Sequence, residues 1–165
     1  MIKTIIFDFD GVIVDSVEVK TNAFAEMYKP FGEEVVKKVV KYHLENGGVS
    51  RFEKFKLYHK NFLGIEVAEN EIKGMVKDFS TLVLDKVIKA PYVLGAKEFI
   101  EANYDKYMMF ISSGTPEFEL KEICIRRGIN EKFKGIYGSP SKKSTHVKKI
   151  LSDWYYWNSM GYRNY

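Results

Sequence analysis

The sequence has a single cysteine and no apolar run long enough to span a membrane. One cysteine excludes an intrachain disulfide framework. Cys124 stands between Ile123 and Ile125, which favours a packed thiol over a nucleophile. A membrane span needs about eighteen consecutive apolar residues, and the N-terminal apolar run stops at Asp8, so it does not have the form of a signal peptide. These absences predict a cytoplasmic protein with no membrane partner.

A strong charge imbalance is also missing. The 26 basic and 22 acidic residues give a formal net charge of +4, far from the footprint of a dedicated nucleic-acid binder. Such a balance still allows a locally positive pocket that attracts anionic substrates. There is no low-complexity tract, and 45% of the 165 residues are hydrophobic. The composition therefore predicts a folded chain with one sizeable core, or a core plus a small accessory domain, and no nucleic-acid partner.

The first half of the chain changes character after a short strand. Residues 2–7 form a β-rich apolar run that is typical of a buried parallel strand. Between residues 17 and 88, apolar residues recur at helical spacing in four segments, which are separated by Gly32, Gly47-Gly48 and Gly64. Four consecutive helices with short connections indicate a small helical bundle inserted after the first strand.

The second half alternates helices with strands. We expect a helix over 95–106, a strand at Tyr107–Ser112, a helix that starts with Thr115 as N-cap and ends at Gly128, a strand over 133–139 and a helix over 144–153. Alternation of this kind favours an α/β fold with a Rossmann-like parallel sheet. The predicted core domain comprises residues 1–16 and 89–165, and the predicted helical domain comprises residues 17–88.

Two aspartates follow the first strand in the string "DFDG". Asp8 and Asp10 lie on the same side of an extended chain, at the carboxyl edge where open α/β sheets bind ligands. Such a carboxylate pair suits Mg²⁺, which binds one or two carboxylates and keeps several waters, and Gly11 permits a sharp turn beside it. The alternative is that both aspartates simply cap a turn. The apolar strand before the pair favours a site.

The string "IIFDFDGVIVDS" resembles the first motif of the haloacid dehalogenase-like hydrolase superfamily, in the branch with an inserted helical cap. That branch includes phosphoglycolate phosphatases and β-phosphoglucomutases. The resemblance implies that Asp8 is the nucleophile, which accepts a phosphoryl group, and that Asp10 is the general acid and then the base. It also implies that the side chain of Asp8 and the backbone carbonyl of Asp10 bind Mg²⁺.

Two further motifs of the superfamily have counterparts. Ser112, at the end of "MMFIS", matches the residue that hydrogen-bonds a phosphoryl oxygen, and Ser113 and Gly114 offer backbone amides near a helix N-terminus. The resemblance implies that these two residues, with Gly11, contact the substrate. The motif lysine is Lys142 or Lys143; we prefer Lys143 because it directly precedes the helix.

The helical segment carries one more resemblance. "GGVSRFEKF" is similar to the cap loop of β-phosphoglucomutase-like proteins, where an arginine in a Gly-Val-Ser-Arg string reaches the substrate. Arg51 matches that arginine, and its guanidinium suits phosphates and carboxylates. The alternative is an ordinary arginine at the start of a helix that Ser50 caps.

The resemblance breaks near the end of the sequence. Members of the superfamily carry a fourth, acidic motif after a fourth strand, and residues 153–165 hold no clear copy of it. Either "WYYWNSMGY" is a degenerate fourth strand, with Asn158 and Tyr162 where aspartates are expected, or the core is incomplete at its C-terminal end. Asp153 is the only acid in this tail. Without a fourth strand the first strand has an open edge, which predicts self-association.

The sequence therefore predicts a Mg²⁺-dependent phosphomonoester hydrolase that acts on a small phosphorylated metabolite through an aspartyl-phosphate. A phosphomutase of the same family is an alternative, but the mutases carry a histidine near position 20, where this chain has Lys20. A catalytically inactive homologue that binds a phosphorylated ligand or a protein partner is a further alternative.

Overall fold

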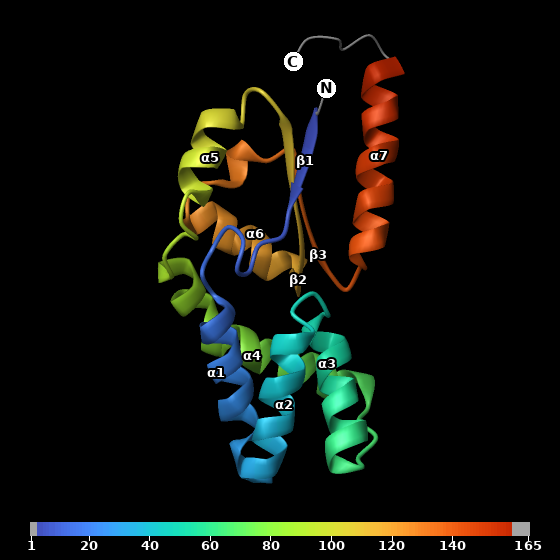
Figure 1. The fold of residues 1–165 in the computed structure, drawn as a ribbon. Coiled ribbons are helices and arrows are strands. Elements are labelled where there is room, and N and C mark those ends of the chain that lie inside the picture. Colours follow the sequence, from blue (N-terminus) through green and yellow to red (C-terminus); the bar gives the residue numbers. More distant parts are fainter. Residues whose placement is uncertain (1–2, 160–165) are drawn as a thin grey trace.

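The computed structural model describes residues 3–159 and the side chains of residues 3–153, as an α/β fold with a helical unit beside a sheet unit (Figure 1). The elements, in chain order, are β1 (Thr4–Phe7), α1 (Val17–Tyr28), η1 (Lys29–Phe31), α2 (Glu33–Glu45), α3 (Arg51–Tyr58), η2 (His59–Leu63), α4 (Glu69–Lys89), α5 (Ala96–Asn103), β2 (Met108–Pro116), α6 (Glu117–Arg126), η3 (Asn130–Lys132), β3 (Gly135–Ser139) and α7 (Lys143–Ser159).

The sheet is parallel, and its described strands lie in the order β1-β2-β3. Phe7 pairs with Ile111, and Ile111 pairs with Ile136, so the residues that follow β1 and the middle of β2 meet at the same edge of the sheet. Helices α5 and α6 cover one face and α7 stands on the other (Figure 1). These features confirm the predicted fold class.

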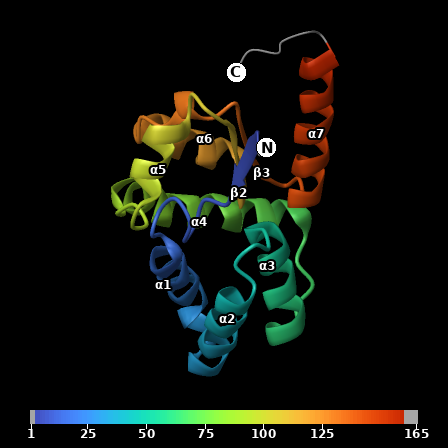
Figure 2. The ribbon, with the colours of Figure 1, turned by 45° about the horizontal axis from the view of Figure 1, so that its top comes forward.

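Helices α1 to α4 form the helical unit, which lies beyond the carboxyl ends of the strands (Figures 1 and 2). Their bounds follow the predicted segments closely. The unit is held together by aromatic packing, in which the ring centroids of Phe24 and Phe79 lie 4.4 Å apart and those of Phe24 and Phe55 lie 5.6 Å apart. The division into two domains at residues 17 and 88 stays a prediction.

The two segments that connect the units run side by side. Asp15 donates its backbone N–H to the carbonyl of Pro91 at 2.9 Å, and Val93 donates to the carbonyl of Ile13 at 3.1 Å. Val14 is fully buried. This pairing fixes the chain between β1 and α1, and therefore the position of the residues just after β1.

One expected helix start is wrong. Strand β2 runs on to Pro116 and α6 begins at Glu117, so Thr115 does not cap that helix. The reason is that Pro116 still pairs with Ser139 of β3, while the Thr115 hydroxyl binds the carboxylate of Asp10. The other end is as predicted: Gly128 follows the C-cap residue Arg127 and adopts a φ of 68°, in the left-handed region.

The C-terminal segment is a helix rather than a strand. Helix α7 continues to Ser159, so the interpretation of residues 154–159 as a degenerate fourth strand is wrong. The side chain of Asn158 and all of Tyr162 lie outside the described residues. Among residues 3–159, β1 has a strand partner on one side only, and self-association through its other edge stays a prediction.

The burial of the single cysteine agrees with the prediction from the sequence. Cys124 is fully buried, as the packed-thiol interpretation requires, and burial raises its pKa to about 12.

Within the described part of the chain, none of the helices combines the length and the apolar character that crossing a membrane demands.

Candidate active site

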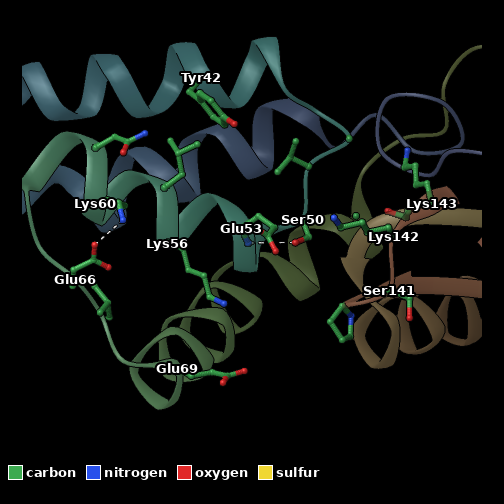
Figure 3. A pocket seen from close by; sticks show the side chains of 18 residues that line it. Tyr42, Ser50, Glu53, Lys56, Lys60, Glu66, Glu69, Ser141, Lys142 and Lys143 are labelled. Carbon is green, nitrogen blue, oxygen red and sulfur yellow. Dashed lines mark hydrogen bonds and ion pairs between the residues drawn. The ribbon is translucent and has the colours of Figure 1, made fainter. Parts of the chain in front are cut away.

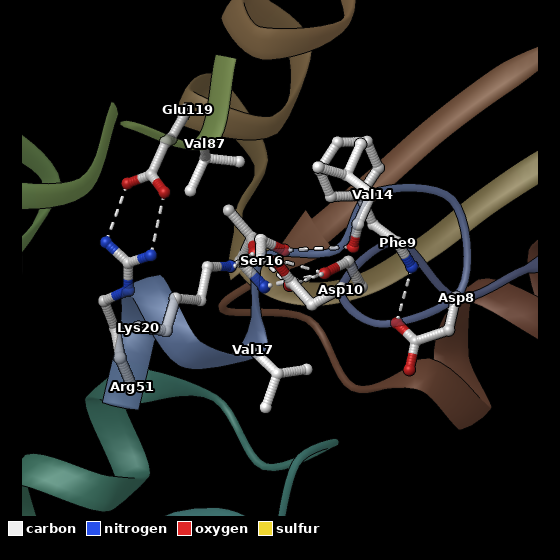
Figure 4. A network of polar contacts seen from close by, with 12 residues as sticks. Asp8, Phe9, Asp10, Val14, Ser16, Val17, Lys20, Arg51, Val87 and Glu119 are labelled. Atoms are coloured by element: carbon white, nitrogen blue, oxygen red, sulfur yellow. Dashed lines mark hydrogen bonds and ion pairs between the residues drawn. The ribbon is translucent and has the colours of Figure 1, made fainter. Parts of the chain in front are cut away.

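Asp8 follows β1 directly and meets a lysine from the far end of the sequence. Its Oδ2 accepts a hydrogen bond from Nζ of Lys143 at 2.6 Å. Its Oδ1 accepts one from the backbone N–H of Phe9 at 2.8 Å (Figure 4). The Asp8 side chain is 36% exposed. A partly exposed carboxylate with a fixed orientation and a neighbouring cation can approach a phosphate ester.

Asp10 lies at the centre of a denser network (Figure 4). Its Oδ1 accepts from Nζ of Lys20 at 2.6 Å and from the hydroxyl of Ser16 at 2.7 Å, and its Oδ2 accepts from Thr115 Oγ1 at 3.0 Å and Ser113 Oγ at 3.4 Å. Burial raises the pKa of Asp10, but the charge of Lys20 and these hydrogen bonds outweigh burial and hold the pKa at about 2. Asp10 is therefore an oriented, ionised carboxylate.

The turn between the two aspartates and α1 depends on Gly11. Its φ is 74°, in the left-handed region, and its N–H donates to the carbonyl of Val14 at 2.8 Å. A Cβ at this position would also lie 3.0 Å from the side chain of Val17. This turn leads the chain from Asp10 into α1, which carries Lys20.

Sequence reasoning missed the roles of Lys20 and Thr115. The ammonium of Lys20 binds Asp10 and also donates to Thr115 Oγ1 at 2.6 Å. Both side chains are buried. The signal for Lys20 was its place on α1, because Lys20, Ala23 and Phe24 are spaced as one buried helix face. A lysine on such a face needs a buried acceptor.

The structure distinguishes the two candidate lysines. Lys143 binds Asp8, whereas the backbone carbonyl of Lys142 accepts hydrogen bonds from the first turn of α7, at Thr145 and His146. Lys143 also lies near the loop before α3, since a Cβ at Gly48 would be 3.8 Å from its ammonium.

Ser112, Ser113 and Gly114, the residues of the second motif, contact different parts of the structure. Ser112 is beside Asp8 in the sheet register, but its hydroxyl lies 2.8 Å from Nδ1 of His146, in a buried contact with α7. Ser113 contacts Asp10 instead. Gly114 allows a close approach of the helical unit, because a Cβ there would lie 3.2 Å from the carbonyl oxygen of Gly48. Helix α6 starts only at Glu117, so these amides are not at its first turn.

Arg51 points toward the sheet unit. Its guanidinium forms a two-point ion pair with Glu119 of α6 at 2.7 and 2.8 Å and donates to Ser80 Oγ of α4 at 3.0 Å (Figure 4). Both charged side chains are buried. Ser50 caps α3 by accepting from the N–H of Glu53, as the alternative interpretation expected. The predicted contact of Arg51 with substrate is untested by this arrangement.

Two clefts are lined by residues of the candidate active site. A cavity of about 200 Å³ is lined by both aspartates and by side chains from the helical unit, namely Lys20, His43, Arg51 and Lys54. A larger cleft of about 880 Å³ lies between α3 and the loop before α7 (Figure 3). Lys143, Ser113 and Gly114 line the larger cleft, but neither aspartate does. The smaller cavity is therefore the one that reaches the candidate nucleophile.

Two oxygen atoms at the site, one each from Asp8 and Asp10, suit Mg²⁺. The carboxylate of Asp8 is partly exposed, and the carbonyl oxygen of Asp10 accepts no hydrogen bond from the residues that the structure describes. One carboxylate and one carbonyl are a sufficient protein contribution for a Mg²⁺ that also binds phosphate oxygens and water. Among residues 3–159 no group of three or more acidic, histidine or cysteine side chains could hold a metal.

Asp153 does not supply the missing carboxylate. It lies ten residues after Lys143 on the same helix, which corresponds to about 15 Å. Its charge acts instead on Tyr137 of β3.

Comparison with known proteins identifies a family. The family model described as haloacid dehalogenase-like hydrolase matches residues 2–149. No curated protein sequence matches the chain.

Solved structures share the fold at low identity. A predicted phosphoglycolate phosphatase from Haemophilus somnus is 18% identical, with a TM-score of 0.58 over 85% of this chain and 64% of that one. A candidate β-phosphoglucomutase from Thermotoga maritima is 20% identical, with a TM-score of 0.52 over 83% and 61%. A candidate hydrolase from Bacillus subtilis, described as bound to magnesium, is 15% identical, with a TM-score of 0.57 over 84% and 65%. The chain thus spans just under two thirds of each of these proteins.

Proposed function

The chain belongs to the haloacid dehalogenase-like hydrolases, and on that premise we propose that it hydrolyses small phosphomonoesters with Asp8 as the nucleophile. The observation that carries this proposal is the 2.6 Å contact between Asp8 and Lys143 at the carboxyl end of β1. A carboxylate approaches a phosphate dianion only where nearby cations and N–H donors neutralise the charge.

The first half of the reaction forms an aspartyl-phosphate. A carboxylate oxygen of Asp8 attacks phosphorus while the bond to the leaving oxygen breaks. Asp10 is ionised in the free chain, but the negative charge of a bound phosphate favours its protonated form, which gives the leaving oxygen a proton. The ammonium of Lys143 stabilises the negative charge on the transferring group. Bound Mg²⁺, held by the Asp8 carboxylate and the Asp10 carbonyl, would supply further charge neutralisation.

The second half returns Asp8 to its free form. Water attacks the phosphorus of the aspartyl-phosphate, the bond to Asp8 breaks, and ionised Asp10 takes the proton from that water. Asp10 releases this proton to solvent when phosphate leaves and takes one up again when the next substrate binds, so the proton balance closes. Lys20, Ser16 and Thr115 orient Asp10 for this transfer.

The helical unit serves this chemistry as a cap. Its four helices lie over the carboxyl edge of the sheet (Figure 2), and the two connecting segments, near residues 13–17 and 86–92, are the places where it would move to admit substrate. The cavity of about 200 Å³ between the units supports a small substrate.

The test is hydrolysis of an aryl phosphate by the 165-residue chain with and without Mg²⁺, beside the Asp8→Asn variant. An aryl leaving group needs little help from a general acid, so the assay isolates the nucleophile and the metal. We expect turnover that is lost with a chelator and in Asp8→Asn. If a folded sample turns over no faster than the variant, the hydrolase proposal is wrong for this chain.

A phosphomutase is the second candidate, supported by the fold that the chain shares with the Thermotoga maritima protein. In a mutase a sugar hydroxyl replaces the attacking water. Interconversion of sugar phosphate isomers without release of phosphate would favour it over hydrolysis.

A further inference from the structure

Each charged group at the catalytic cavity has a partner of opposite charge, with one exception. Lys143 binds Asp8, Lys20 binds Asp10, and Arg51 binds Glu119. These three pairs account for both aspartates of the cavity and for two of the three cations that line it. The exception is Lys54, which binds no carboxylate among the described residues.

Lys54 is deeply buried and faces a neutral partner. Its side chain is 2% exposed, and its Nζ lies 2.8 Å from Nδ1 of His43. The pKa of His43 is lowered to about 4, chiefly by burial and then by the charge of Lys54, so the imidazole is neutral and accepts the hydrogen bond. Phe24 adds a ring face 5.7 Å from the ammonium. The charge of Asp10 acts on Lys54 across the cavity, but none of these contacts pairs the ammonium with a carboxylate.

His43 adds a second unused donor. Because Nδ1 accepts from Lys54, the ring proton of neutral His43 is on Nε2. That nitrogen is buried and has no partner within the described part of the chain. Buried N–H groups without partners are rare in folded proteins. His43 and Lys54 both line the cavity that holds Asp8 and Asp10.

A buried, unpaired cation is costly to a fold, and a lysine that only filled space could be replaced by an apolar side chain of the same length. Both residues line the cavity, and an ammonium next to a histidine whose buried N–H has no partner is suited to an anionic oxygen. Lys143 lies beside Asp8, where the transferring phosphate would bind. Lys54 and His43 are therefore available for a different anionic group.

We propose that Lys54 and His43 bind a second anionic group of the substrate, so that the chain acts on small phosphate esters that also carry a carboxylate or a second phosphate. The proposal rests on the proposed function, since it concerns the same cavity. Its direct consequence is a preference between ligands that differ only in that second group.

Binding of stable phosphonates tests the proposal without turnover. The probes are 4-phosphonobutanoate, its matched neutral analogue 4-hydroxybutylphosphonate, and butane-1,4-bisphosphonate, titrated calorimetrically in the presence of Mg²⁺. We expect the unmodified chain to bind one of the two doubly anionic probes at least about tenfold more tightly than the hydroxyl analogue, because the hydroxyl analogue cannot form the charge-assisted hydrogen bond to Lys54. The tighter of the two identifies the second group as carboxylate or phosphate.

The variants assign the preference to Lys54. Lys54→Met keeps the side-chain length and removes the charge, and should remove the preference. Lys54→Gln is the second variant, in case the first does not fold, and circular dichroism checks both. Lys73→Met, at an exposed position of α4, is the matched control and should keep the preference.

Two results would overturn the proposal: no preference in the unmodified chain, or a preference that survives in the folded Lys54 variants. Both are distinguishable from failure of the proposed function. A chain that hydrolyses aryl phosphate without any ligand preference loses only this inference. A chain that shows the preference but forms no product loses only the hydrolase proposal.

Discussion

Arg51 and Glu119 join the helical unit to the sheet unit through a buried two-point ion pair. The guanidinium nitrogens lie 2.7 and 2.8 Å from the two carboxylate oxygens. The hydroxyl of Ser80 binds both partners, and the guanidinium carbon lies 4.3 Å from the centre of the Phe79 ring. Because Arg51 and Ser80 belong to the helical unit and Glu119 to α6, the pair holds the two units in the observed arrangement.

The first prediction follows from the burial of this pair. Removing one partner, as in Glu119→Leu or Arg51→Met, leaves an uncompensated buried charge and should lower the free energy of unfolding by about 3–5 kcal/mol. The double variant should recover most of that loss. Urea unfolding of the four proteins measures the coupling. Single variants within 1 kcal/mol of the unmodified chain would show that the pair is not buried in solution.

The second prediction concerns the two adjacent lysines. Lys143→Met should lower kcat by about 10²–10³-fold, because the variant loses the cation that stabilises charge on the transferring phosphoryl group. Lys142→Met is the matched control, one residue away and without contact to Asp8, and should stay within about threefold in kcat/KM. Steady-state kinetics with an aryl phosphate measures both. Equal losses in the two variants would contradict the assignment of Lys143.

The third prediction concerns Lys20 and acid stability. Burial raises the pKa of Asp10, and Lys20 contributes most to lowering it from 3.8 to about 2. A carboxyl group whose pKa is lowered by folding stabilises the fold above its unfolded pKa, and that contribution is lost as the pH falls through the folded value. Lys20→Met should therefore be less stable than the unmodified chain at pH 5, and the difference should shrink between pH 4 and pH 2. Thermal unfolding across this range measures it; a difference that does not depend on pH would show that Lys20 acts through packing alone.

The fourth prediction concerns Lys54 and alkaline stability. Burial and the charge of Lys20 lower the pKa of Lys54 from 10.5 to about 8. Between these two values the unfolded chain binds more protons than the folded chain, so the stability contributed by this residue rises with pH. Lys54→Met should accordingly exceed the unmodified chain in unfolding free energy at pH 7, and the gain should fall as the pH rises from 8 to 10. If Lys54→Met stabilises the chain and also abolishes the ligand preference, Lys54 contributes to ligand binding and not to the stability of the fold.

Much of the fold was predictable because local patterns determine it. Glycines and helical spacing marked α1 to α4 within a few residues, and the apolar runs before Asp8 and Ser112 marked two of the strands. Thr115 shows why such reasoning has limits. Its sequence neighbours favour a helix cap, but a carboxylate from β1's end, more than a hundred residues earlier, binds its hydroxyl instead.

Residues of the candidate site could be predicted from the sequence only where they belong to a motif of the family. Lys143 binds Asp8, and Asp8 and Asp10 line one cavity, while the catalytic roles that the resemblance implies stay predictions. Lys20, His43 and Lys54 come from α1, α2 and α3, and only the packing of these helices brings them to one cavity. The partner of Arg51 in the structure is Glu119, on an element that no local pattern links to it; the substrate contact that its sequence string suggests stays a prediction.

The mass of the Asp8 peptide, after acid quenching of the chain during turnover of a phosphate ester with Mg²⁺, decides whether Asp8 is the nucleophile. We predict a phosphoryl group on the peptide that contains Asp8, absent from the Asp8→Asn variant and lost when the quenched sample is treated with hydroxylamine, which cleaves acyl phosphates. Phosphate release without any phosphoryl group on that peptide, in quenches fast enough to sample the first turnover, would contradict Asp8 as the nucleophile.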